Sequence, residues 1–259
     1  MARTFLIDTD TASDDAVALI MALRADHVRV AGITLVAGNV NLDQAVRNAL
    51  YTVELCGAST PVFKGAERPL ERPYHSATWF HGEDGFGDRG YPEPKLKPEA
   101  VHAVDAIISI VHANPGLVLV TLGPLTNVAL ALQKDPSIAA LVGRCVIMGG
   151  APCCEGNVTP AAEYNIWVDP DAARIVMRAG LPIELIGWHL CRGEAIINDR
   201  EIVELLAFET AAARFAVECN ATAIESIRTQ TGELGICLPD PVAMGIALDP
   251  TLVVAASTH

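Results

Sequence analysis

Hydrophobic residues along this chain gather in short, continuous runs. Such runs differ from the alternating pattern of a half-exposed strand and are typical of strands buried on both faces. They occupy residues 4–8, 28–36, 117–123, 144–150 and 182–187. The pattern therefore predicts buried strands of a mainly parallel sheet.

Segments with helical periodicity follow these runs. The clearest are residues 14–25, 41–57, 123–135 and 169–180. Gly180 and Pro182 mark the end of the last one. Strands that alternate with helices predict an α/β fold, with an open, mainly parallel sheet flanked by helices and right-handed crossovers. Because no repeat or low-complexity linker divides the sequence, we expect a single domain over residues 1–259.

Composition and charge narrow the classes of function. The chain is 51% hydrophobic, enough to bury a large core, and its formal net charge is −13 at pH 7. We find no basic stripe for nucleic acid, so we expect a small molecule or a cation as partner. No apolar stretch approaches the roughly 20 residues of a membrane span and no leader opens the chain, which predicts a cytoplasmic protein without a membrane partner. Seven cysteines without CxxC spacing do not suggest a zinc site.

Four aspartates surround the first predicted junction between strand and helix: Asp8, Asp10, Asp14 and Asp15. In open α/β sheets, ligands bind beyond the carboxyl ends of the strands, which is where this group falls. Helix capping and the helix dipole would account for two of the four. Like charges so close together raise one another's pKa unless a positive group neutralises them. The remaining charge therefore favours a hard divalent cation or a catalytic role.

Other predicted strand ends carry amides and carboxylates as well. These residues are Asn39, Asn157, Glu163 and Asn165, and Asp240 opens a further predicted helix. Taken singly, each is also typical of a turn or a helix cap. Together at one edge of a sheet, they suit a polyhydroxylated ligand such as a sugar, whose hydroxyl groups need donors and acceptors in fixed directions.

Seven sequence blocks follow one another along the chain. They are "DTDTASDDAVAL" at the start, "GNV" (38–40), "HGEDGFGD" (81–88), "TLGPLTNVALAL" (121–132), "MGG" (148–150), "AEYNIWVDPDAA" (162–173) and "PDPVA" (239–243). In this order they closely resemble the inosine-uridine nucleoside hydrolase family, from residue 6 to about residue 248. The resemblance implies the nucleoside hydrolase fold with its Rossmann-like core. It also implies calcium-dependent hydrolysis of ribonucleosides to free base and ribose, by a homo-oligomer that is a dimer or a tetramer.

The resemblance assigns roles to the matching residues. The implied ligands of the calcium ion are Asp10, Asp15, Asp240 and the backbone carbonyl of Leu122. The implied ribose-binding residues are Asp14, Asn39, Met148, Asn157, Glu163 and Asn165. Asp10 would also be the general base that accepts a proton from the attacking water, and Asp8 would orient the acidic loop. The carboxylates would stabilise the positive charge that develops on the ribose as the base leaves.

Pro239 departs from the family pattern, in which many members carry a histidine here as the acid for the leaving group. Proline has no proton to donate, so this acid must lie elsewhere or be absent. His81 is our first candidate, because the ordinary pKa of histidine suits acid catalysis near neutrality. His189 is the second. Alternatively, Trp79 and Phe80 would stack on the base.

The last part of the chain is less informative. Arg228 and Gln230 lie in a region that caps the base in relatives, but we prefer to interpret both as part of a solvated helix face. Base recognition would depend on loops 66–98 and 222–239, which do not decide between purine and pyrimidine nucleosides. The chain stops at "TLVVAASTH", a predicted strand, several tens of residues earlier than family members usually do.

Two other functions remain open. A riboside-binding relative with little or altered hydrolase activity would explain Pro239. A phosphatase of the haloacid-dehalogenase type would also place an aspartate after an apolar strand, as in "DTDT". The phosphatase requires a later lysine and an acidic pair at a strand end, which we do not find, and it leaves "AEYNIWVDP" unexplained.

Overall fold

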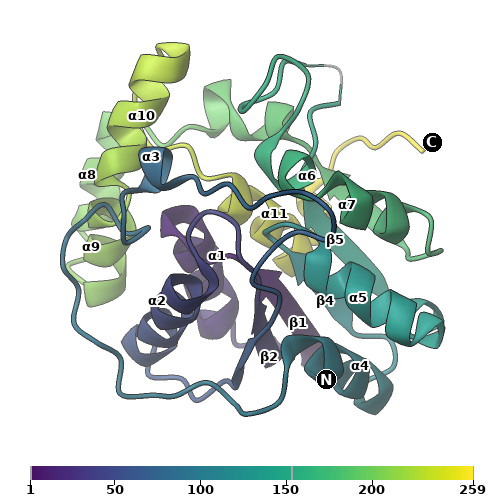
Figure 1. Ribbon diagram of the computed structural model, residues 1–259. Helices are drawn as coiled ribbons and strands as arrows, with labels where there is room; N and C mark the ends of the chain where they lie inside the picture. Colours follow the sequence, from purple (N-terminus) through teal and green to yellow (C-terminus); the bar gives the residue numbers. More distant parts are fainter. Residues whose placement is uncertain (1, 153, 259) are drawn as a thin grey trace.

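The computed structural model describes residues 2–152 and 154–258, and this part of the chain is built on a six-stranded sheet (Figure 1). The strands are β1 Arg3–Thr9, β2 Val28–Leu35, β3 Val62–Lys64, β4 Val118–Thr121, β5 Arg144–Met148 and β6 Ile183–Ile186. They lie in the order β3-β2-β1-β4-β5-β6, and every pairing is parallel. The strand order reverses between β1 and β4, and ligands of open parallel sheets bind at such a point.

Helices cover both faces of the sheet (Figure 1). They are α1 Ser13–Arg24, α2 Leu42–Leu55, α3 Thr78–His81, α4 Ala103–Ala113, α5 Thr126–Lys134, α6 Tyr164–Val168, α7 Pro170–Met177, α8 Asp199–Leu206, α9 Ala211–Glu218, α10 Ala221–Thr231 and α11 Pro239–Leu248, with short 3-10 turns at Pro136–Ala140, Trp188–Cys191, Gly193–Ala195 and Pro250–Leu252. One hydrophobic cluster joins the sheet to α1, α2 and α11, and a second joins it to α4, α5 and α7.

Strand β1 shows why the hydrophobic runs are continuous. Phe5 and Ile7 belong to the first cluster, whereas Leu6 belongs to the second. Successive side chains of a strand point to opposite faces, and here both faces are covered by helices. The predicted open, mainly parallel α/β sheet is therefore confirmed.

Several elements were not predicted. Strand β3 has three residues, too few for a hydrophobic run to be recognised. Helix α4 contains the β-branched series "IISIV", which has the composition of a strand. The irregular segment 66–98 contains one helical turn, α3, which the sequence analysis missed.

The predicted strand at the end of the chain is wrong. Residues 250–252 form a 3-10 turn, and residues 253–258 are not in a strand. Val254 is 99% exposed. Apolar, β-branched residues form a strand only where a neighbouring strand and a buried face accept them, and neither is available to these residues.

None of the helices in the described part of the chain is both long and apolar enough to cross a membrane.

Candidate active site

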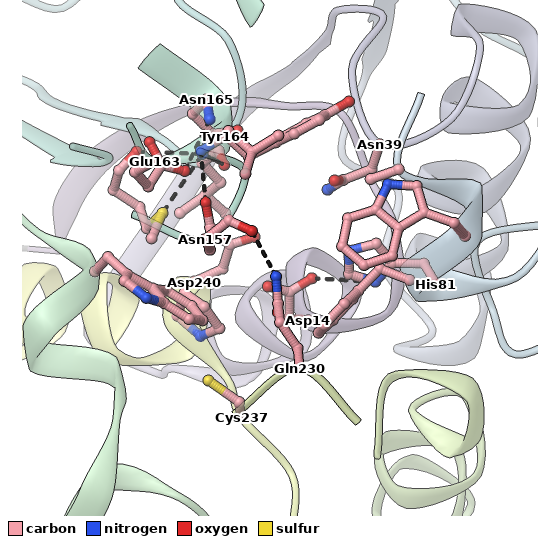
Figure 2. A pocket seen from close by; sticks show the side chains of 18 residues that line it. Asp14, Asn39, His81, Asn157, Glu163, Tyr164, Asn165, Gln230, Cys237 and Asp240 are labelled. Atoms are coloured by element: carbon pink, nitrogen blue, oxygen red, sulfur yellow. Dashed lines mark hydrogen bonds and ion pairs between the residues drawn. The ribbon is translucent and has the colours of Figure 1, made fainter. Parts of the chain in front are cut away.

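The ends of β2, β4 and β5 and the helices α1, α3, α10 and α11 share one pocket (Figure 2). Its polar lining consists of Asp14, Asn39, His81, Asn157, Glu163, Tyr164, Asn165, Gln230 and Asp240. Its other lining residues include Trp79, Phe80, Leu122, Met148, Val158, Trp188, Cys237 and Pro239. All six residues predicted to bind ribose therefore lie around the same cavity.

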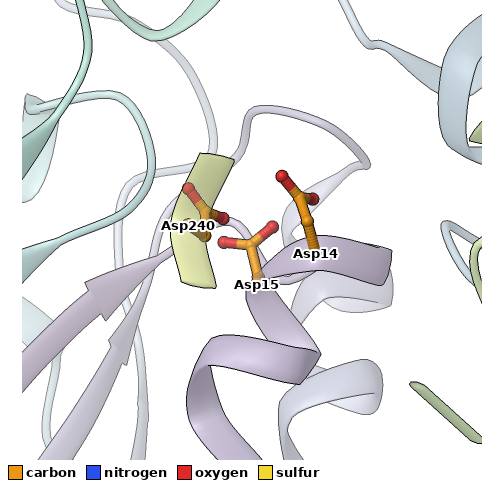
Figure 3. Close-up of side chains that lie close together, drawn as sticks. All are labelled: Asp14, Asp15 and Asp240. Carbon is orange, nitrogen blue, oxygen red and sulfur yellow. The ribbon is translucent and has the colours of Figure 1, made fainter. Parts of the chain in front are cut away.

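Three carboxylates form the acidic end of this site (Figure 3). Asp14 and Asp15 lie in the first turn of α1, and Asp240 lies in the first turn of α11. Each offers an oxygen that lies within 4.8 Å of the others. The N-termini of two helices thus meet here, which partly offsets the negative charge.

Asp10 follows β1 and completes the acidic group. It is fully buried, as is Asp15, and neither is among the residues that line the pocket. Burial raises the pKa of Asp10 well above its ordinary value, and the charges of Asp15 and Asp14 raise it further. Asp10 therefore interacts electrostatically with the other three carboxylates, although it is not part of the group whose oxygens lie within 4.8 Å of one another.

Burial also shifts the other carboxylates of the group. It raises the pKa of Asp14 and of Asp15 to about 6, and that of Asp240 well above the ordinary value. None of the described lining residues is a lysine or an arginine that could neutralise the group. Without a cation, the charged state of these residues is therefore disfavoured.

Short hydrogen bonds fix Asp10 and Asp15. The backbone N–H of Asn39 donates to Asp10 Oδ2 at 2.6 Å. Thr9 Oγ1 donates to Asp15 Oδ1 at 2.5 Å, and the backbone N–H of Ala12 donates to Asp15 Oδ2 at 2.8 Å. The loops after β1 and β2 therefore hold both carboxylates in place.

The residues present fit a hard divalent cation. Asp10 Oδ1 and Asp14 Oδ1 are buried and have no hydrogen-bond partner among the described residues. A buried carboxylate oxygen without a partner carries a desolvation cost that a cation would relieve. The fourth ligand implied by the sequence, the Leu122 carbonyl, accepts a hydrogen bond from Asn165 Nδ2 at 2.8 Å. A carbonyl oxygen has a second lone pair, so this bond leaves room for a cation.

The side of the pocket assigned to ribose is built around α6. Glu163 caps this helix: its Oε1 accepts from the Asn165 N–H at 2.8 Å, and its Oε2 accepts from the Gly150 N–H at 2.8 Å. Asn165 Nδ2 also reaches the carbonyl of Met148 at 3.3 Å. Asn157 Oδ1 accepts from the Tyr164 N–H at 2.9 Å. Glu163 therefore caps a helix and lines the pocket at the same time.

His81 lies in the pocket and His189 does not. His81 is buried, and its Nδ1 lies 2.9 Å from Ser13 Oγ and 3.9 Å from Asp14 Oδ1. Burial lowers the pKa of His81 to about 4, so its ring is neutral at pH 7. His189 is exposed and is not a lining residue.

Gln230 is exposed, as its interpretation as part of a solvated helix face predicts, but its side chain also lines the pocket. Its Nε2 donates to the backbone carbonyl of Asn157 at 2.6 Å, across the pocket (Figure 2). Arg228 does lie on an exposed face, where it pairs with Glu225. The sequence placed Gln230 in the segment 222–239 assigned to base recognition but gave no sign of this contact, because its partner lies 73 residues away.

Other site residues were also missed. Ser13, Tyr164, Trp188 and Cys237 contact His81 or line the pocket. Trp188 follows the end of β6, so the rule that strand ends form the site would have found it. Tyr164 stood inside the block "AEYNIWVDPDAA" without a role.

Asp8 lies away from the pocket in a buried network. Asn127 Nδ2 donates to both carboxylate oxygens of Asp8, at 3.2 and 3.1 Å, and to the carbonyl of Leu35 at 2.9 Å. Burial raises the pKa of Asp8 to about 7. The network joins β1, β2 and α5 behind the acidic loop.

Comparisons with known proteins point to one family. A family model described as inosine-uridine preferring nucleoside hydrolase matches residues 5–259. An uncharacterised protein of Schizosaccharomyces pombe is 43% identical over 184 residues, which cover 70% of this chain and 59% of that protein. A probable uridine nucleosidase 1 of Oryza sativa is 36% identical over 249 residues, which cover 95% of this chain and 76% of that protein.

A solved structure has the same fold. It is a purine-preferring ribonucleoside hydrolase from Gardnerella vaginalis, 36% identical, with a TM-score of 0.91. The match covers 97% of this chain and 82% of that one. The chain thus spans 59% to 82% of the length of these three relatives.

Proposed function

Because this chain belongs to the inosine-uridine preferring nucleoside hydrolase family, we propose that it hydrolyses ribonucleosides to free base and ribose in a calcium-dependent reaction. The observation that carries the proposal is the buried acidic group beside amides that suit a sugar. Calcium would be held by Asp10, Asp15, Asp240 and the Leu122 carbonyl, a set of hard oxygen ligands. Bound calcium would supply polarisation of the attacking water and of the ribose diol.

Asp10 is the proposed general base. Its Oδ2 is occupied by the Asn39 N–H, whereas its Oδ1 is buried and has no hydrogen-bond partner among the described residues. This free oxygen can accept a proton from water.

The ribose would lie between the acidic group and α6. Breaking the N-glycosidic bond develops positive charge on the sugar ring, and the nearby carboxylates favour that state over the neutral substrate. Asn39, Asn157 and Asn165 offer amide groups to the hydroxyls. Their side chains come from three different segments, so the sugar would be oriented from several sides.

The base would leave toward the apolar end of the pocket. Trp79, Phe80 and Trp188 are apolar lining residues that the base could contact, and Pro239 contributes no proton donor. His81 remains our candidate for contact with the base. Since its low pKa keeps it neutral, it would offer an N–H hydrogen bond rather than a full proton.

One alternative follows from Pro239. A relative that binds ribosides but hydrolyses them slowly would keep the acidic group and lose the leaving-group acid. The phosphatase alternative is disfavoured, because no lysine or arginine is among the described lining residues to bind a phosphate. A homo-oligomeric state also remains a prediction, which sedimentation in solution would test.

The decisive experiment measures release of base and ribose from inosine, adenosine, guanosine, uridine and cytidine. The chain is first stripped of metal, and calcium is then added back, with Asp10→Asn as the control. Calcium-dependent release that Asp10→Asn abolishes supports the proposal and reveals the preferred base. Calcium binding without cleavage of any riboside would instead favour the binding relative.

Pro239→His separates the two functions further. A histidine at the first position of α11 would restore the acid found in many family members. A clear rise in turnover would mean that the lost acid limits this enzyme. Unchanged turnover would remove Pro239 as the reason for slow hydrolysis.

A further inference from the structure

Two glycines flank the carboxylate of Asp10. Gly38 lies in the loop after β2, and Gly123 lies in the loop after β4. A Cβ built on Gly38 would overlap Asp10 Oδ2 and lie 2.7 Å from its Cγ. A Cβ built on Gly123 would lie 2.6 Å from Asp10 Oδ1 and 2.9 Å from its Cγ. The carboxylate therefore occupies space that is available only because neither residue has a Cβ.

The reason for glycine here is space and not backbone conformation. Neither Gly38 nor Gly123 is among the residues with positive φ. Alanine could therefore adopt the same backbone at both positions, and its cost would arise from contact with Asp10. Asp10 is fully buried and its Oδ2 is bonded to the Asn39 N–H, so it cannot turn away freely.

We propose that Gly38 and Gly123 are positioning residues that set the orientation of Asp10 and keep its Oδ1 free of protein hydrogen bonds, so that it faces the cation and the attacking water. The two glycines lie in the loops that follow β2 and β4, the strands on either side of β1. These loops therefore enclose the Asp10 carboxylate from two sides. This role explains why the blocks "GNV" and "TLGPLTN" carry glycine at these points. The part of the inference that concerns calcium rests on the proposed function.

The first test compares three alanine variants. Gly38→Ala and Gly123→Ala place a methyl group against Asp10. Gly32→Ala is the matched control, because its Cβ would lie 2.8 Å from Ile110 Cδ1 and 3.0 Å from Phe63 Cε2, so its nearest neighbours are apolar. Calcium affinity is measured by calorimetry on stripped protein, and the thermal midpoint is measured without metal.

We expect the two site variants to bind calcium at least tenfold more weakly than the parent chain. The control should lose stability but keep its calcium affinity. If Gly123→Ala binds calcium as tightly as the parent, or if Gly32→Ala loses as much affinity, the inference is wrong.

A double-mutant cycle with Asp10→Ala separates positioning from a general structural cost. Asp10→Ala removes the Oδ1 and Cγ atoms that a methyl group on Gly123 would meet. Gly123→Ala should therefore lower the thermal midpoint clearly more in the parent chain than in the Asp10→Ala background, where its Cβ would still lie 3.0 Å from the backbone nitrogen of residue 10. An equal drop in both backgrounds would overturn the inference. Gly38 is less suited to this cycle, because its Cβ would still lie 2.9 Å from the Cβ of residue 10.

The same experiments distinguish failure of the proposed function from failure of the positioning role. If the parent chain binds no calcium, the calcium proposal fails, while the cycle measured without metal still decides whether Gly123 positions Asp10. If the parent binds calcium and the cycle is additive, the positioning role fails alone.

Discussion

At the scale of single residues, Asp10 makes the sharpest prediction. Asp10→Asn keeps an oxygen that can accept the Asn39 N–H but removes the base and one buried charge. We expect turnover to fall by about 10²- to 10⁴-fold, the range for loss of general acid-base catalysis. In the absence of metal, the variant should unfold at a higher temperature, because burial disfavours the charged carboxylate. Steady-state kinetics and thermal melts of stripped protein would check both; undiminished turnover would remove Asp10 as the base.

The shifted carboxylates predict how calcium and pH act together. In the chain without metal, the pKa of Asp14 and of Asp15 is raised from 3.8 to about 6. A raised pKa contributes stability that is present below the ordinary value and is lost as pH rises through the folded value. The stripped chain should therefore lose stability between about pH 4 and pH 6 as these two groups become charged. Calcium binds the charged form, so its stabilising effect should grow over the same range.

Thermal melts from pH 4 to pH 8, with and without calcium, test this linkage. The difference between the two melting temperatures should increase from pH 4 to about pH 6, the range over which Asp14 and Asp15 become charged. A difference that stays constant across this range would show that calcium binding is not coupled to protonation of these carboxylates.

The sequence could predict most polar residues of the site but few of their contacts. Asp14, Asn39, Glu163 and Asn165 follow strands or begin helices, and the carboxyl ends of parallel strands meet at one edge. The contact between Ser13 and His81 depends on how the irregular segment 66–98 folds back on α1. No local pattern carries that information, because the two residues are 68 positions apart.

At the scale of elements, helix α11 links the site to the opposite edge of the sheet, where strands β1 and β5 begin. Its first turn carries Asp240, and its last carbonyls accept hydrogen bonds from two arginines. Arg3 Nη1 and Arg144 Nη1 donate to the carbonyl of Ala247 at 3.0 and 3.2 Å. Arg144 also forms two bonds of 2.7 Å with Glu184 on β6. Positive charge at the C-terminal end of a helix also stabilises its dipole.

Arg144→Met should therefore destabilise the protein by about 1 to 3 kcal/mol, the usual effect of losing charged hydrogen bonds that are partly buried. Calcium affinity should fall as well, because the position of α11 fixes Asp240. Arg174→Met is the control, since Arg174 is exposed and pairs only with Asp171 among the contacts in the described structure. Urea unfolding and calorimetry measure the two effects; equal losses in both variants would contradict the link through α11.

Elements were predicted best where hydrophobic periodicity and helix caps agreed. Helix α2 begins after Asn41, whose side chain caps it, and its buried residues recur at helical spacing. Helix α8 was missed although Asn198 and Glu201 form a capping box, because none of its residues is buried. The elements directly before it are short 3-10 turns and not a buried strand, whereas the prediction of the other helices depended on a preceding strand.

At the scale of the whole molecule, the pocket is completed by segments that are distant in sequence. Loop 149–163, which carries Asn157, is joined to the end of α10 by the bond from Gln230. A second connection runs through Arg192, which pairs with Glu155 on the loop and with Glu233 after α10. The sugar side and the apolar side of the pocket therefore depend on each other's position.

Gln230→Ala removes the hydrogen bond to the Asn157 carbonyl, so Asn157 should be positioned less firmly. We expect KM for ribosides to rise by about 2- to 10-fold, the equivalent of one hydrogen bond of about 0.5–1.5 kcal/mol. Turnover at saturation should change little, because the lost bond positions the substrate and does not touch the reacting atoms. Arg228→Ala is a control on the same helix, since Arg228 pairs with Glu225 on the exposed face. Steady-state kinetics of both variants on the preferred riboside measure the effect. A large fall in kcat with unchanged KM would instead place Gln230 in the chemical step, where its amide would contact the departing base.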